Sequence, residues 1–156
     1  MWGTTAGKML MTFLFAMTPV FELRGAIPVA VANGLDLPVA IVVGILGNLL
    51  PVPFLILFIR KVLFWLRKHL RFLDGFIGKL EARAQKKSEL LQKSEFWGLV
   101  LLVAIPLPGT GAWTGALVAA TLDMRLKRAL PAIMLGVVIA GVLIGLLSHT
   151  VGTALG

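Results

Sequence analysis

Two ionisable residues, Glu22 and Arg24, interrupt an apolar run at residues 9–35. Charged groups at membrane depth are costly, so they usually face a partner, a water-filled cavity or a substrate. These two also lie between Pro19 and Pro28, where a continuous helix is disfavoured. The carboxylate could exchange a proton or bind a cation, and the guanidinium could hold an anionic group. A broken, charged segment within a bilayer indicates a transport site, and a structural ion pair that pins the break is the alternative.

A second candidate segment lies in the uncharged apolar run at residues 96–122. It reads Pro-Leu-Pro-Gly-Thr-Gly-Ala-Trp-Thr-Gly over residues 106–115. Prolines free backbone carbonyls, glycines allow close approach, and the ends of interrupted helices carry partial charges. Thr114 adds a hydroxyl group, and Trp113 offers either an aromatic wall or ordinary packing. The predicted substrate- or ion-binding residues of the chain are Glu22, Arg24, Pro28, Asn48, Pro106, Pro108, Gly109, Thr110, Gly111, Trp113 and Thr114.

Structural roles compete with binding roles at several of these positions. Gly111 and Gly115 form a G-x-x-x-G pair, which is typical of close helix packing. Asn48 can hydrogen-bond either toward a break or to a neighbouring helix. Gly141 and Gly145 indicate a further close helix contact, either within one chain or across a homodimer.

The apolar segments of the chain come in two designs. Residues 37–59 and 129–148 would form helices about 34 Å and about 30 Å long, enough to cross a hydrocarbon core of about 30 Å. Residues 9–35 and 96–122 instead consist of short apolar arms on either side of a break, at residues 9–21 and 26–35 in the first and at residues 96–105 and 112–122 in the second. Each arm would reach about 15–20 Å as a helix, which suits a re-entrant hairpin whose tip lies in protein or water.

Basic residues define the expected topology. Thirteen of the 15 Lys and Arg residues lie at residues 60–93 and 125–128. If both broken segments are re-entrant, these two basic segments lie on the same membrane face, whereas single crossings would separate them. The positive-inside rule therefore favours hairpins, with residues 60–95 in the cytoplasm and both termini outside. The two halves would then be inverted repeats, and laying Leu35 on Leu122 aligns their turns.

The basic segment between the halves also contains apolar residues at three- and four-residue spacing. This pattern predicts an amphipathic helix lying on the inner leaflet, and a cytoplasmic helical hairpin that packs on itself is the alternative. The apolar residues of the pattern are Val62, Trp65, Leu66, Leu70, Leu73, Phe76, Ile77 and Leu80.

The composition restricts the class of protein. Apolar residues make up 58% of the 156 residues and charged residues only 14%, against about a quarter in soluble domains. The formal charge of +8 would favour a nucleic-acid partner in a soluble protein, but its confinement between apolar runs indicates membrane topology instead. The sequence has no cysteine, no cluster of metal ligands and no serine placed with an obvious base for catalysis. We therefore expect no metal, no cofactor and no enzyme activity.

The motif Phe-Glu-Leu-Arg-Gly-Ala-Ile-Pro at residues 21–28, taken with Pro-Leu-Pro-Gly-Thr-Gly-Ala-Trp-Thr-Gly-Ala at residues 106–116, resembles the small multidrug export family of prokaryotes. That family looks like a compact relative of the DedA, or VTT-domain, superfamily. The resemblance implies inverted re-entrant hairpins, and either lipid translocation or ion-coupled transport. It also implies that Glu22 matches the acidic residue of the first hairpin and that Pro108 and Gly109 match the Pro-Gly of the second. DedA proteins typically carry arginines around that Pro-Gly, whereas this chain has no basic residue at residues 96–122.

The sequence thus predicts a single all-α integral membrane domain over residues 1–156, located in a prokaryotic inner membrane. Residues 1–59 and 96–156 form two inverted repeats, each a re-entrant helical hairpin followed by a transmembrane helix. The expected function is ion- or proton-coupled secondary transport of small molecules. Glu22 would be the coupling site, and Arg24 would be its partner or an anion clamp.

Two other functions stay open. A flippase for an anionic lipid carrier such as undecaprenyl phosphate would use Arg24 to bind the head group. A non-transporting membrane scaffold would depend on the basic segment to bind lipids or partners. The expected partners are membrane lipids, a small-molecule or lipid substrate and, because each chain is small, a second copy in a homodimer.

Overall fold

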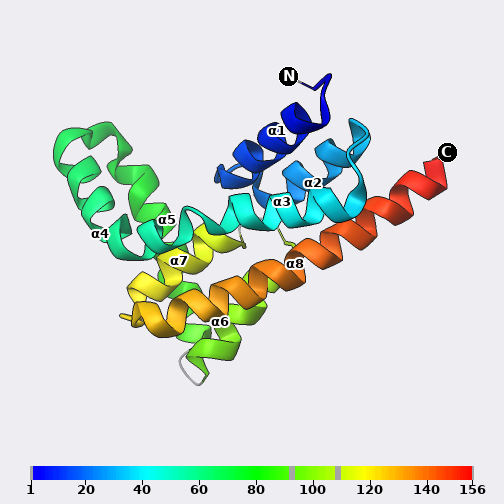
Figure 1. Cartoon of the computed structure of the whole chain (residues 1–156). Helices are drawn as coiled ribbons and strands as arrows, with labels where there is room; N and C mark the ends of the chain where they lie inside the picture. The colour runs from blue at the N-terminus through cyan, green and yellow to red at the C-terminus, as the bar shows by residue number, and fades with distance from the viewer. Residues whose placement is uncertain (1, 92–93, 108–109, 156) are drawn as a thin grey trace.

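The computed structural model describes residues 2–91, 94–107 and 110–155, and all regular structure in these ranges is helical (Figure 1). Pro108 and Gly109, two of the predicted site residues, lie outside the described residues. The all-α prediction is confirmed. The elements are α1 (Thr5–Met17), α2 (Glu22–Ala32), α3 (Leu37–Leu49), α4 (Val52–His69), the 3-10 helix η1 (Arg71–Leu73), α5 (Asp74–Leu91), α6 (Glu95–Ala104), α7 (Ala112–Thr121) and α8 (Leu126–Leu155).

Two stretches of helix are long and apolar enough to cross a membrane. The first runs through α3 and α4 over Leu37–His69, and the second is the Leu126–Val151 part of α8. Both contain the predicted spanning segments and extend beyond them. Figure 1 shows α3 and α8 passing through the centre of the molecule, with α1 and α2 packed on α3 and α6 packed on α8.

Glycines on α8 allow its close contact with α3, as the spacing of Gly141 and Gly145 predicts. A Cβ atom on Gly141 would lie 2.8 Å from Cγ1 of Ile45, and one on Gly145 would collide with the side chain of Ile41. Only a residue without a side chain lets the two helices approach this closely. The contact lies within one chain.

The short helices match the predicted arms to within a few residues, and the chain breaks at residues 18–21, between α1 and α2, and again between α6 and α7. One detail of the prediction is wrong, because Glu22 and Arg24 lie in the first turn of α2 and not in the break. The chain leaves α1 at Thr18, whose ψ of 145° is extended, and Glu22 takes a left-handed φ of 44° where α2 begins. Such a conformation costs about 1–2 kcal/mol for a residue with a Cβ atom, so the surrounding contacts must hold it.

The same turn ends α2 and α7. In each turn, the residue after a positive-φ position donates its backbone N–H to the carbonyl five residues earlier. The positive-φ residue is Gly34 (77°) in the first turn and Asp123 (54°) in the second. This hydrogen-bond pattern is a Schellman motif. In this comparison of the two turns, Leu35 is equivalent to Met124. The sequence alignment, which paired Leu35 with Leu122, was therefore two residues out of register at this turn.

The amphipathic helix predicted over residues 62–80 is interrupted. α4 ends at His69, Leu70 has φ −127° and ψ 71°, and η1 leads into α5, which turns back alongside α4 (Figure 1). Asp74 begins α5, where a negative charge favours a helix N-terminus. The helical-hairpin alternative therefore describes this segment better, although α5 also packs on α7 and buries Ile77.

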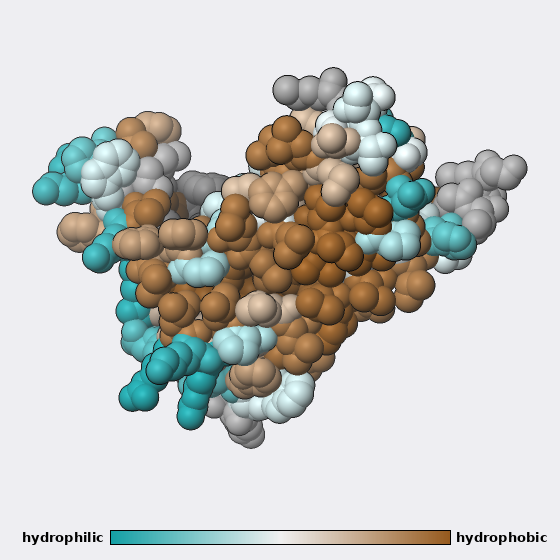
Figure 2. All heavy atoms as spheres, in the orientation of Figure 1, coloured by the Kyte–Doolittle hydropathy of each residue, from teal (hydrophilic) through white to brown (hydrophobic). Residues whose placement is uncertain are grey.

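Large apolar side chains cover much of the outer surface. Figure 2 shows them across the middle of the molecule, with hydrophilic residues gathered toward its ends. A continuous exposed apolar surface of this kind marks an interface with lipid or protein. Residues of the two membrane-length helices that are at least 53% exposed include Val42, Leu46, Phe54, Leu57, Leu146 and Leu147.

Candidate functional site

Glu22 connects the first pair of short helices to the second. Its side chain lies at the N-terminus of α7, where the backbone N–H of Trp113 donates to Oε1 over 3.3 Å. The first N–H groups of a helix have no partner within the helix and attract negative charge. The N-cap residue of α7 is Gly111, which has no side chain to cap it. The carboxylate of Glu22, in a residue that is 7% exposed, therefore caps α7 from another element.

Gly111 makes room for this carboxylate. Its φ of 127° is a conformation that residues with a Cβ atom rarely adopt, and a Cβ atom would also collide with Oε2 of Glu22. The backbone conformation and the position of the carboxylate thus each require a glycine. Close helix packing, the alternative role of the G-x-x-x-G pair, applies to Gly115, which faces Val103 of α6.

Arg24 holds the second break together. Its Nη1 donates to the carbonyl of Leu107, and its Nη2 donates to the carbonyl and the hydroxyl of Thr110 over 2.5 Å and 2.6 Å. Carbonyls in a broken segment lack intrahelical donors, and the fork of N–H groups on a guanidinium satisfies several of them at once. Arg24 therefore has a structural role that the sequence pattern did not reveal.

The alternative of a direct ion pair between Glu22 and Arg24 does not describe the site. Among residues that the structure describes, the ion pairs are Arg60 with Asp123 and Arg67 with Glu81. Glu22 and Arg24 instead bind neighbouring parts of the second half, the N-terminus of α7 and the break that precedes it. Both contacts join the two halves of the chain.

We expect Arg24→Lys to destabilise the protein by about 2 kcal/mol, because an ammonium group cannot replace a fork of charged hydrogen bonds. Thermal unfolding of the purified protein in detergent measures this loss. Arg71→Lys, at an exposed position of η1, is the matched control and should leave the midpoint unchanged. Equal midpoints for the two variants would contradict the role assigned to Arg24.

One pocket of about 430 Å³ collects most of the predicted residues. Small-molecule sites usually have volumes of about 300–1,000 Å³. The indole N–H of Trp113 donates to the carbonyl of Met17 over 3.2 Å, which fixes the indole relative to the end of α1. The lining residues are Glu22, Arg24, Pro106, Thr110, Trp113 and Thr114, which were predicted, and Pro19, Val20 and Phe21, which were not. The available signal for Pro19, Val20 and Phe21 was their position directly before Glu22 in the sequence.

An apolar cavity of about 520 Å³ adjoins this pocket between α2 and α8. Arg24 and Pro106 line both spaces, and Pro28 lines the apolar one, together with Ile144 and Leu147 of α8. Pro28, which was predicted to bind substrate, thus borders the neighbouring cavity and not the pocket of Glu22.

A third and much smaller cavity, of about 10 Å³, lies deeper, beside Glu22, Gly111 and Asn48. Its volume is close to the minimum for one water molecule. Asn48 is 1% exposed, and its Oδ1 has no hydrogen-bond partner among the described residues. A buried acceptor without a donor is destabilising, so this carbonyl oxygen is available to a group that can donate a hydrogen bond.

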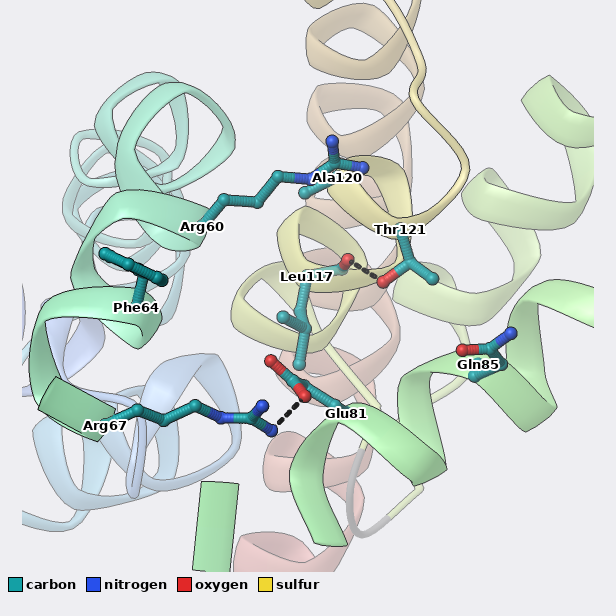
Figure 3. A pocket seen from close by; sticks show the side chains of 8 residues that line it. All are labelled: Arg60, Phe64, Arg67, Glu81, Gln85, Leu117, Ala120 and Thr121. Carbon is teal, nitrogen blue, oxygen red and sulfur yellow. Dashed lines mark hydrogen bonds and ion pairs between the residues drawn. The ribbon is translucent and has the colours of Figure 1, made fainter. Parts of the chain in front are cut away.

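A separate pocket of about 380 Å³ lies between α4, α5 and α7 (Figure 3). Arg60 and Arg67 extend from α4 on either side of Phe64. Arg67 pairs with Glu81 of α5, and Arg60 pairs with Asp123 over 2.7 Å. This pocket was not predicted from the sequence, although the seven-residue spacing of the arginines places them on one helix face. Its arginines are already paired with acidic groups, so the pocket of Glu22 is the stronger candidate site.

Membrane-length helices and an apolar outer surface support a membrane location, and the charged pocket lies beside interrupted helices, as the binding sites of many transporters do. No group of three or more His, Cys, Asp or Glu side chains in the described part of the chain could hold a metal ion. The chain belongs to the family described as "putative small multi-drug export protein", which matches residues 22–143. The family name denotes a transport role, which is not an enzyme class. No curated protein and no solved structure is significantly similar to the chain.

Proposed function

We propose that the protein is an ion- or proton-coupled secondary transporter that exports small molecules. Its substrate site would lie between the tips of two re-entrant hairpins, α1–α2 and α6–α7. The observation that carries this proposal is the position of Glu22. Its carboxylate borders a pocket of about 430 Å³ and is bound by the N-terminus of a helix from the other half of the chain. Secondary transporters use the ends of interrupted helices in this way to bind charged groups.

In this proposal, proton and substrate movement are coupled because Glu22 can gain and lose a proton. The carboxylate accepts a hydrogen bond from a backbone N–H group and is not held by an ion pair. Its protonation would therefore leave no positively charged partner without its counter-charge. A group that gains and loses a proton as the pocket fills and empties links the proton gradient to substrate movement.

Two contacts support inverted hairpins. At one end of the molecule, Nζ of Lys8 donates to the carbonyl of Gly34 over 3.2 Å, which places the start of α1 beside the α2–α3 turn. At the other end, Arg60 pairs with Asp123 over 2.7 Å, which places the middle of α4 beside the α7–α8 turn. The proposed arrangement puts the second end in the cytoplasm, together with most of the basic residues.

Single-cysteine variants test this topology, because the sequence contains no cysteine. We expect Asp36→Cys to react with a membrane-impermeant maleimide added outside intact cells. Lys79→Cys, which is also exposed, should react only after the membrane is opened. Labelling of both variants from the same side would contradict the inverted arrangement.

Proton flux in proteoliposomes tests the function. Vesicles that contain the purified protein and a pH-sensitive dye are challenged with a panel of drugs and with a polyprenyl phosphate. Flux that depends on one of these compounds would support coupled transport and identify the class of substrate. Absence of flux with every compound, from protein shown to be folded, would count against it.

The apolar cavity beside Arg24 favours a second candidate, a DedA-like flippase for an anionic lipid carrier. At about 520 Å³, with an almost entirely apolar lining and one guanidinium, it has the character of a site for a lipid tail next to a charged head group. This function would move lipid without requiring a proton gradient. Measuring the movement of the polyprenyl phosphate across the bilayer of the same vesicles separates the two candidates, because a flippase alone would translocate it with no proton flux.

A further inference from the structure

The carboxylate of Glu22 occupies a position that suits an anion from outside the chain. We propose that the N-terminus of α7 binds an anionic group of the substrate, a carboxylate or a phosphate. In this proposal the ionised carboxylate of Glu22 occupies the anion site at α7. It leaves the site when it is protonated and turns toward Asn48. The proposal rests on the proposed transport function and adds the charge of the substrate to it.

The surroundings of the carboxylate are those of an anion site. The N-terminus of α7, a helix of 10 residues, donates the N–H of Trp113, and Gly111 leaves open the space that a side chain would fill. Arg24 lines the adjoining pocket, and its charge remains even though its N–H groups are bound to carbonyls. A helix N-terminus beside a guanidinium favours a negative ligand, and an ionised Glu22 is the ligand that the chain itself supplies.

Asn48 offers the side chain of Glu22 a second partner. Both residues line the cavity of about 10 Å³, which also borders Gly111. Oδ1 of Asn48 can only accept a hydrogen bond, and in the described part of the chain no group donates to it. An ionised carboxylate cannot donate either, but a protonated one can. Protonation thus changes which partner suits Glu22, from the N–H groups of α7 to the carbonyl oxygen of Asn48.

The exchange conserves charge. Glu22 takes up one proton to form an O–H bond, and an anionic group of the substrate replaces its carboxylate at α7. Among described residues that line these two cavities, Arg24 is the sole other charged group, and it stays charged throughout. With a singly charged anionic group, the site therefore has the same net charge before and after, so proton uptake and anion binding favour each other.

Equilibrium binding to the purified full chain in detergent tests the proposal without requiring transport. The probes are phenyl phosphate and phenyltrimethylammonium, which have similar size and opposite charge, and inorganic phosphate, which has no apolar part. We expect the wild-type protein to bind phenyl phosphate, more tightly at lower pH, and to prefer it to phenyltrimethylammonium. Glu22→Gln removes the competing charge and should bind phenyl phosphate at least about tenfold more tightly, with only the pH dependence that the second ionisation of phenyl phosphate, at a pKa of about 6, itself introduces. Binding of inorganic phosphate alongside phenyl phosphate would show that the anionic group suffices.

Two further variants complete the design. Asn48→Leu removes the second partner, so phenyl phosphate binding by the otherwise wild-type protein should weaken. Glu95→Gln, which also removes a carboxylate from the first turn of a helix, is the matched control and should change nothing. Weaker phenyl phosphate binding by folded Glu22→Gln, or a preference of the wild type for the cation, would overturn the proposal. Anion binding without proton flux would keep this inference and reject coupled transport.

Discussion

Glu22→Gln will reduce substrate-dependent proton flux in proteoliposomes to the level of vesicles without protein. Glutamine has nearly the same shape as glutamate and keeps a carbonyl oxygen that can accept from Trp113, but it cannot carry a proton. Loss of the charge at the end of α7 should cost less than about 1 kcal/mol of stability, so the variant should remain folded. Flux is measured with the pH-sensitive dye, and folding by gel filtration and thermal unfolding.

The exposed carboxylate of Asp36 provides the control for this prediction. Asp36→Asn removes one negative charge from a turn outside the candidate site and should leave the flux unchanged. Wild-type flux by folded Glu22→Gln would reject Glu22 as the coupling group. Equal losses in both variants would mean that the assay responds to charge in general.

Gly111→Ala will destabilise the protein by about 2 kcal/mol or more and will also abolish flux. Alanine is strained at a φ of 127°, and its Cβ atom would displace the carboxylate of Glu22 from α7. The free energy of unfolding in detergent measures the first effect, and the proteoliposome assay measures the second. Gly78→Ala is the control, because Gly78 lies within α5 with open space around its Cα, and alanine should be neutral or slightly stabilising there.

A double-mutant cycle separates strain from collision in this prediction. In a Glu22→Ala background there is no carboxylate to displace, so Gly111→Ala should cost only the backbone strain, about 1–2 kcal/mol. If the cost of Gly111→Ala is the same with and without the glutamate side chain, then the close contact between residues 22 and 111 contributes nothing to stability.

Hydropathy and charge predicted most of the helical layout because these signals are local. The ends of α6 and α7 lie within one residue of the predicted arms, since the prolines and glycines between them interrupt any helix. The end of α4 at His69 was missed, because Leu70 is apolar and residues 70–73 contain neither proline nor glycine. Asp74, a residue typical of helix starts, was the available signal.

The site was predicted as a set of residues, but its contacts were not. Glu22 and Gly111 lie far apart in the sequence. No local pattern shows that the glycine leaves the space that the carboxylate of Glu22 occupies. Arg24 was predicted to bind a carboxylate or an anion, because a positively charged side chain is expected to have a negatively charged partner. Its partners are instead the carbonyls of Leu107 and Thr110. Backbone groups have no sequence signature of their own, so contacts to them emerge only from the fold.

The contacts of Arg24 have a consequence for the order in which the protein is made. The carbonyl of Thr110, just before α7, accepts from the guanidinium of Arg24 in α2, and α7 is capped by Glu22. The N-terminal half leaves the ribosome first, so both side chains are already in the membrane when the second break arrives. A fragment comprising only the C-terminal half would lack the donor that Arg24 supplies to the carbonyl of Thr110 and the carboxylate that caps α7. Biosynthesis from the N-terminus thus has Arg24 and Glu22 in place before their partners, Thr110 and the start of α7, are made.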